Sequence, residues 1–175
     1  TTQHALISSP LLAELLPIVR ETALMIADPQ IRYKGTIGGN CANGDPGNDM
    51  PALMQCLNAR YALTGVTGTR DVSARSFYLG AYETALAAGE ILTSVRIPIP
   101  PAGHGYAYEK LKRKVGDYAT AAAAVVITMA AGTCTSASIG LTNVSETPLW
   151  AAEAGGILTG SALDVATIDR AVAAA

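Results

Sequence analysis

The sequence predicts an α+β fold. Strand-like alternation and helix-like periodicity occur in mixed order, without the regular strand–helix–strand rhythm of a doubly wound sheet. The chain has 175 residues, of which half are hydrophobic and 15% are charged. This composition supports a buried core and excludes a disordered chain. Because soluble domains carry roughly 25% charged residues, we expect part of the apolar surface to be covered by another segment or subunit.

The expected elements follow from local signals along the chain. Ser9 followed by Pro10 is typical of a helix start, and Pro17 opens a second helix that ends before Asp28. Five glycines and three asparagines within residues 32–49 predict a segment that is neither helix nor strand. Further helices are expected over residues 49–57, 76–85 and 162–174, the first of them capped by Asn48 or Asp49.

Strands are expected where apolar residues alternate. They cover residues 60–63, 69–72, 91–97, 106–111 and 135–141, and the first two form a hairpin around Gly65 and Gly68. Residues 119–129 fit either a buried strand or a helix. The proline cluster at residues 98–101 is the clearest linker, so we expect one domain over residues 1–100 and a second over 101–175.

Several classes of function are disfavoured. Three widely spaced cysteines without a CxxC pair and two distant histidines supply neither a disulfide framework nor a metal site, so we expect free buried thiols and no metal ligands. Residues 119–131, the longest apolar stretch, are too short for a transmembrane segment. The chain is net acidic, and its basic run at 110–114 lacks interleaved aromatics, which argues against a nucleic-acid partner.

The pentapeptide Thr36, Ile37, Gly38, Gly39, Asn40 is the most informative motif. Paired glycines let backbone N–H groups approach an anion, while the threonine hydroxyl and asparagine amide add neutral donors. The pattern matches neither the dinucleotide fingerprint nor the P-loop. It therefore predicts a site for a phosphate-bearing cofactor, with a purely structural turn as the alternative.

These residues resemble a known family. Residues 31–40, followed by 43–46 and 49–52, look like the second flavin loop of the FAD subunits of molybdenum hydroxylases, the xanthine dehydrogenase family. The stretches 43–54 and 110–119 point to its carbon-monoxide-oxidising branch, and the resemblance covers essentially the whole chain. It implies the second part of an FAD-binding domain of the vanillyl-alcohol-oxidase (PCMH) type, followed by the start of a flavoprotein C-terminal domain.

The resemblance also implies roles for individual residues. Residues Thr36–Asn40 would hold the FAD pyrophosphate, and Asp49 would bond its sugar or ribityl hydroxyls. Leu92 would lie against the isoalloxazine, Lys110 near that ring and Tyr118 over it. No residue of this chain is expected to act on the primary substrate.

Each of these roles has a plainer alternative that the sequence leaves open. Asp49 would serve equally as a helix cap, Leu92 as a strand core residue, and Lys110 as part of a solvated basic run with residues 112–114. The first flavin loop of the family is missing, so we expect a chain cut at both ends that aggregates or fails to retain FAD when it is expressed alone.

The resemblance finally implies an assembly. A large subunit with a molybdenum–copper centre and a small subunit with [2Fe-2S] clusters would join this FAD subunit in a dimer of heterotrimers, a heterohexamer. Electrons from oxidation of carbon monoxide with water would pass through the clusters and FAD to a quinone. The complex would be cytoplasmic, at the inner face of the cell membrane. The alternatives are a sibling enzyme acting on xanthine, nicotinate or an aldehyde, and a flavin-free scaffold fragment.

Overall fold

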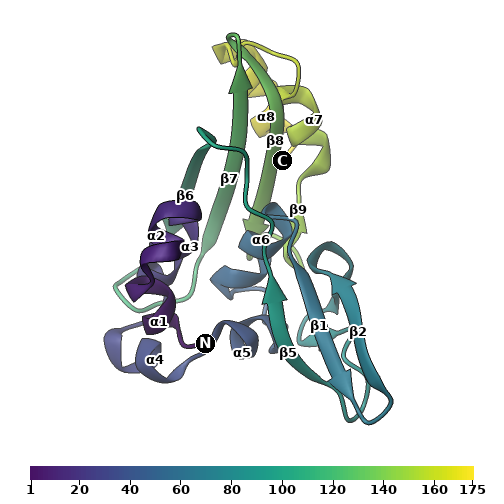
Figure 1. Cartoon of the computed structure of the whole chain (residues 1–175). Coiled ribbons are helices and arrows are strands. Elements are labelled where there is room, and N and C mark those ends of the chain that lie inside the picture. The colour runs from purple at the N-terminus through teal and green to yellow at the C-terminus, as the bar shows by residue number, and fades with distance from the viewer.

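The computed structural model describes all 175 residues and has an α+β fold (Figure 1). Four short helices open the chain, and two more follow them within the first third of the sequence. They are α1 (Gln3–Ser8), α2 (Pro10–Leu15), α3 (Pro17–Met25), α4 (Pro29–Lys34), α5 (Ile37–Ala42) and α6 (Asp49–Cys56). Ser9 caps α2 and Asp28 caps α4, each accepting a backbone N–H with its side chain. None of the helices is long and apolar enough to cross a membrane.

A three-stranded antiparallel sheet follows, with strand order β2-β1-β5. It comprises β1 (Arg60–Gly65), β2 (Gly68–Ser73) and β5 (Ile91–Arg96), and the expected hairpin joins its first two strands. Between β2 and β5 lie the 3-10 turn η1 (Ala74–Ser76) and a small hairpin of β3 (Tyr78–Gly80) and β4 (Glu83–Thr84). Strand β5 lies beside α5, so this sheet covers one side of α5 (Figure 1).

A second antiparallel sheet, in the order β6-β7-β8-β9, forms the rest of the chain. Its strands are β6 (Gly105–Leu111), β7 (Ala121–Ala130), β8 (Thr133–Thr142) and β9 (Leu149–Trp150). Two helices, α7 (Ala152–Leu158) and α8 (Val165–Ala173), lie at the end of this sheet farthest from the first sheet, α7 packing beside β8 and α8 against α7 (Figure 1). Of the ambiguous residues 119–129, those from Ala121 onward thus belong to a strand.

The main core runs through both parts of the chain. Helix α6 is buried along all eight of its residues, including the polar side chains of Asp49 and Gln55. Met50, Leu53 and Met54 belong to the same cluster of buried side chains as Tyr108 and Ala124 on the second sheet. Gly140 of β8 allows the closest contact, since a Cβ there would lie 2.2 Å from the Ala52 carbonyl oxygen. The packing therefore crosses the linker at residues 98–101.

Two expectations about secondary structure are wrong. Residues 32–49 were expected to be irregular, yet α5 begins inside the glycine-rich motif because Thr36 caps it and its apolar side chains Ile37 and Cys41 are buried. Residues 76–85 were expected to be a helix. They instead form the β3–β4 hairpin, and Phe77, directly before β3, packs edge-on against Tyr61 at a ring separation of 4.8 Å.

Candidate functional site

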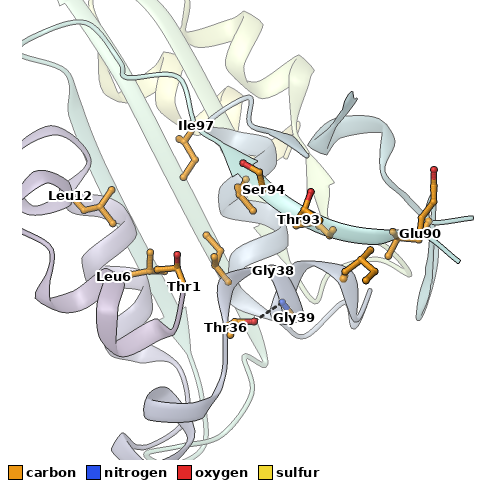
Figure 2. A pocket seen from close by; sticks show the side chains of 16 residues that line it. Thr1, Leu6, Leu12, Thr36, Gly38, Gly39, Glu90, Thr93, Ser94 and Ile97 are labelled. Atoms are coloured by element: carbon orange, nitrogen blue, oxygen red, sulfur yellow. Dashed lines mark hydrogen bonds between the residues drawn. The ribbon is translucent and has the colours of Figure 1, made fainter. Parts of the chain in front are cut away.

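The first turn of α5 borders a cavity of about 630 Å³ that lies between the N-terminal helices and β5 (Figure 2). Thr36, Ile37, Gly38 and Gly39 line one wall, and Leu92 on β5 lies across from Gly38. A Cβ on Gly38 would lie 3.5 Å from the Leu92 side chain, so the missing side chain leaves open space on the cavity side of this turn. Five of the nine predicted site residues therefore share this cavity.

The hydrogen bonds of this turn leave neutral donors for an anion. Thr36 Oγ1 accepts the Gly39 N–H at 2.9 Å, which leaves the hydroxyl proton of Thr36 free to donate. The Gly38 N–H donates to no group of the protein, whereas the Ile37 N–H donates to the Thr1 carbonyl. No Lys or Arg side chain lines the cavity. Any phosphate bound here would be held by neutral N–H and O–H groups.

The only charged side chain in this cavity is already paired. Glu90 accepts two hydrogen bonds from Arg70, each 2.7 Å long, and a third from the Ala87 N–H at 2.8 Å. These bonds, that of Arg70 first, lower the pKa of Glu90 to about 2. The carboxylate of Glu90 therefore stays ionised. Its bonds to Arg70 hold residues 85–90 against β2 of the β1–β2 hairpin.

A second, smaller cavity of about 300 Å³ holds the other predicted residues. Asn40, Asp49, Lys110 and Tyr118 line it, together with Asn48. Asn40 connects the two helices here: its Oδ1 accepts the Met50 N–H at 3.2 Å, and its carbonyl accepts the Asn48 side-chain amide at 3.0 Å. The side-chain N–H groups of Asn40 donate to no group of the protein, so they too remain available to a ligand.

A buried ion pair forms the floor of the second cavity. Lys110 Nζ lies 2.7 Å from Asp49 Oδ2, and the two side chains are only 1% and 5% exposed. Lys110 also donates to the Met25 carbonyl at 3.3 Å, at the C-terminus of α3. The Tyr108 hydroxyl donates to the other carboxylate oxygen, Asp49 Oδ1. Burial and the neighbouring Asp49 carboxylate raise the pKa of Tyr108 well above its ordinary value, so this hydroxyl keeps its proton.

These contacts decide between interpretations that the sequence left open. Asp49 does not cap α6 with its side chain; Asn48 is the N-cap residue, and no side-chain bond closes that turn. Lys110 is not part of a solvated basic run, because its ammonium is buried against Asp49. Leu92 does line a cavity, but not the one that Lys110 and Tyr118 share.

One tyrosine, Tyr118, lines this cavity, and another, Tyr108, lies behind Asp49. The Tyr118 side chain is 62% exposed and lies against Gly47, where an added Cβ would come within 3.3 Å of the ring. Tyr108 was missed by the sequence analysis. The available signal was its position two residues before Lys110, since alternate residues of a strand point to the same side.

The three cysteines are free and buried, as the sequence suggested, and burial raises the pKa of Cys41 and Cys56 to about 11.

Comparison with known families agrees with the fold. Residues 1–100 match the FAD binding domain in molybdopterin dehydrogenase, and residues 106–175 match the CO dehydrogenase flavoprotein C-terminal domain. The chain therefore belongs to the FAD-binding family of the molybdopterin dehydrogenases.

Individual relatives narrow the similarity further. The chain is 71% identical, over all of its 175 residues, to the carbon monoxide dehydrogenase medium chain of Afipia carboxidovorans. It is 48% identical over 149 residues, 85% of the chain, to that of Hydrogenophaga pseudoflava, of which 52% is covered. It superposes on a chain of the reconstituted CO dehydrogenase from Oligotropha carboxidovorans with a TM-score of 0.99 at 72% identity, again over its full length. The chain spans 61% of the length of the Afipia relative and of the Oligotropha chain.

Proposed function

We propose that this chain is the FAD-carrying, electron-transferring part of the medium subunit of an aerobic carbon monoxide dehydrogenase. The observation that carries the proposal is the 71% identity to such a medium chain, which extends over every residue of this chain. Under this proposal residues 1–100 form the FAD-binding domain and residues 101–175 belong to the flavoprotein C-terminal domain.

The cavities fit FAD on chemical grounds. A pyrophosphate needs closely approaching donors, which the Gly38 N–H and the Thr36 hydroxyl supply in the first cavity without a positive charge, whereas Asn40 lines the second cavity. Ribityl or ribose hydroxyls need an acceptor, and the Asp49 carboxylate supplies one in the second cavity. FAD is an extended molecule whose pyrophosphate and ribityl chain need separate subsites. The two cavities on either side of α5 supply two such subsites. We assign the pyrophosphate to the first turn of α5 and the ribityl hydroxyls to Asp49.

The remaining predicted residues have roles that follow from their surroundings. Tyr118 is exposed beside Lys110 and Asp49, so its ring can cover a flavin held in the second cavity. Leu92 supplies an apolar wall opposite Gly38. Lys110 contributes through its ion pair, because Asp49 already balances its charge. FAD, when bound, supplies a carrier that accepts a pair of electrons and passes them on.

The chain would work within a larger complex. In this proposal a large subunit with a molybdenum–copper centre oxidises carbon monoxide with water to carbon dioxide, releasing two protons and two electrons. The electrons pass through [2Fe-2S] clusters of a small subunit to the FAD held here, and then to a quinone. The absence from this chain of cysteines spaced for an iron–sulfur cluster supports that division of labour. We propose a dimer of heterotrimers in the cytoplasm, at the inner face of the cell membrane.

Isolation of the complex by a tag on this chain tests the proposed activity. The purified complex is assayed with carbon monoxide and with xanthine, nicotinate and an aldehyde, using an artificial electron acceptor and then a quinone analogue. We expect oxidation of carbon monoxide and three co-purifying polypeptides. Activity only on one of the organic substrates would instead identify a sibling enzyme, and a complex without flavin would identify a scaffold.

A Gly38→Ala variant tests the assigned loop. A methyl group at this position makes only an ordinary contact with Leu92, so the protein is expected to fold while losing space beside the turn. We expect flavin content to fall well below one per subunit, whereas Gly156→Ala, at an open position of α7, keeps full flavin. Full flavin in Gly38→Ala would refute the assignment of the pyrophosphate to this turn.

A further inference from the structure

The carboxylate of Asp49 is held from two sides by one strand. Tyr108 and Lys110 are alternate residues of β6, and both point toward the N-terminus of α6. The tyrosine hydroxyl donates to Oδ1, and the lysine ammonium donates to Oδ2 at 2.7 Å. Each oxygen of Asp49 thus has its own donor, and the plane of the carboxylate is defined by two bonds rather than one.

This arrangement leaves part of the carboxylate unused. Two carboxylate oxygens offer about four lone-pair directions, and the two bonds from β6 occupy two of them. Asp49 is 4% exposed overall, yet it lines the second cavity together with Asn40, Asn48 and Tyr118. The remaining acceptor directions are therefore the ones that a hydroxyl in this cavity can reach.

The two donors do different work. The contact with Lys110 places a cation 2.7 Å from Oδ2, but a single contact lets a carboxylate rotate about its Cβ–Cγ bond. The Tyr108 hydroxyl stops that rotation. It does so without adding charge, and its buried proton is not lost in the ordinary pH range. Tyr108 itself does not line the cavity, so any effect on a ligand must pass through Asp49.

We propose that Tyr108 is a positioning residue of the cofactor site, one that aims the free acceptor directions of Asp49 at the ribityl hydroxyls of FAD. The inference rests on the proposed function, because it requires that FAD occupies the second cavity. It assigns to Tyr108 of the second sheet, far along the sequence from the glycine motif, a part in the affinity for the cofactor that is exerted through Asp49.

The test uses the intact complex, stripped of flavin and reconstituted with FAD or with FAD analogues that lack the 2′-, 3′- or 4′-hydroxyl of the ribityl chain. Tyr108→Phe removes one bond and leaves the ion pair intact. Tyr106→Phe is the matched control, because its hydroxyl lies on the same strand and donates to Glu21 at the surface. We expect Tyr108→Phe to raise the dissociation constant of FAD about tenfold, and Tyr106→Phe to leave it unchanged.

The analogues separate positioning from general loosening of the protein. If Tyr108 acts through Asp49, one of the analogues binds wild type and Tyr108→Phe equally well, because the hydroxyl that Asp49 contacts is missing. A tenfold loss that persists with all three analogues would overturn the proposal, as would unchanged binding of FAD. Should the variant retain FAD during stripping, the rates of FAD release give the same comparison. A wild-type complex that binds no FAD would instead refute the proposed function itself.

Discussion

Gly140 of β8 is the position where a single methyl group should have the largest effect on this fold. It is buried beneath α6, and a Cβ added there would lie 2.2 Å from the Ala52 carbonyl oxygen, 2.9 Å from the Ala52 carbonyl carbon and 3.1 Å from the Cys56 Cβ. Side-chain atoms rarely approach a backbone oxygen closer than 3.0 Å. In Gly140→Ala, α6 and β8 must therefore separate by about 1 Å, since none of these three atoms is the movable end of a flexible side chain.

The expected cost follows from that displacement. Overpacking a core typically destabilises a protein by about 1–3 kcal/mol, and an obstacle formed by backbone belongs at the upper end of this range. For a chain of this length about 3 kcal/mol corresponds to a decrease in Tm of roughly 6–12 °C. Thermal unfolding followed by circular dichroism measures the change. Since α6 begins with Asp49, a decrease in FAD affinity should accompany the loss of stability.

Gly156→Ala is the matched control, because the same methyl group meets nothing within 4 Å at this exposed position of α7. Replacing a glycine inside a helix by alanine should stabilise the protein by about 0.5–1 kcal/mol. A Tm for Gly140→Ala within about 2 °C of wild type, well short of the expected decrease, would show that α6 does not lie against β8 as described.

Three further predictions concern charge and protonation. Because burial raises the pKa of Cys41 and Cys56 to about 11, both thiols should resist alkylation by iodoacetamide at pH 8 and react only after unfolding; rapid labelling of the native protein, read by mass spectrometry, would contradict this. Glu90→Gln should lower the Tm near neutral pH, where the carboxylate is paired with Arg70. The folded-state pKa of Glu90, about 2, lies below the ordinary value of 4.5, so the stabilisation exists above pH 4.5 and is lost toward pH 2. The Tm values of wild type and Glu90→Gln should therefore converge near pH 2. A Tm difference independent of pH would refute the assignment. Asp164→Ala, which removes the N-cap of α8, should cost about 1 kcal/mol in chemical denaturation, whereas Asp164→Asn should cost less.

Local signals predicted much of the fold but failed where long-range packing decided the outcome. The hairpin of β1 and β2 follows from Gly65 and Gly68, and the start of α8 from Asp164. Glycine disfavours helices, which made the motif at α5 look irregular, but the Thr36 cap and the burial of Ile37 outweigh that preference. The sequence of residues 76–85 was compatible with a helix, yet packing of Phe77 and Tyr78 against Tyr61 of β1 favours a hairpin.

The candidate site shows the same limit. The glycine motif and its donors could be found within a few residues of sequence, and so could the resemblance that pointed to Leu92, Lys110 and Tyr118. That Asp49 is paired with Lys110, and oriented by Tyr108, could not be found in this way. The partners are about 60 positions apart, and no local pattern records which inward-facing residue of β6 meets the start of α6.

The burial of α6 has a consequence for how the protein is made. Its outer surface is covered by β7 and β8, and Thr142, the last residue of β8, follows Cys56 by 86 positions. At synthesis rates of about 5–20 residues per second, this mostly apolar helix stays uncovered by β7 and β8 for about 4–17 s. During this interval the nascent chain is a natural client for a chaperone that binds apolar segments. Folding of the polypeptide is therefore completed late in synthesis. Its N-terminal part does not acquire its final packing before the second sheet has left the ribosome.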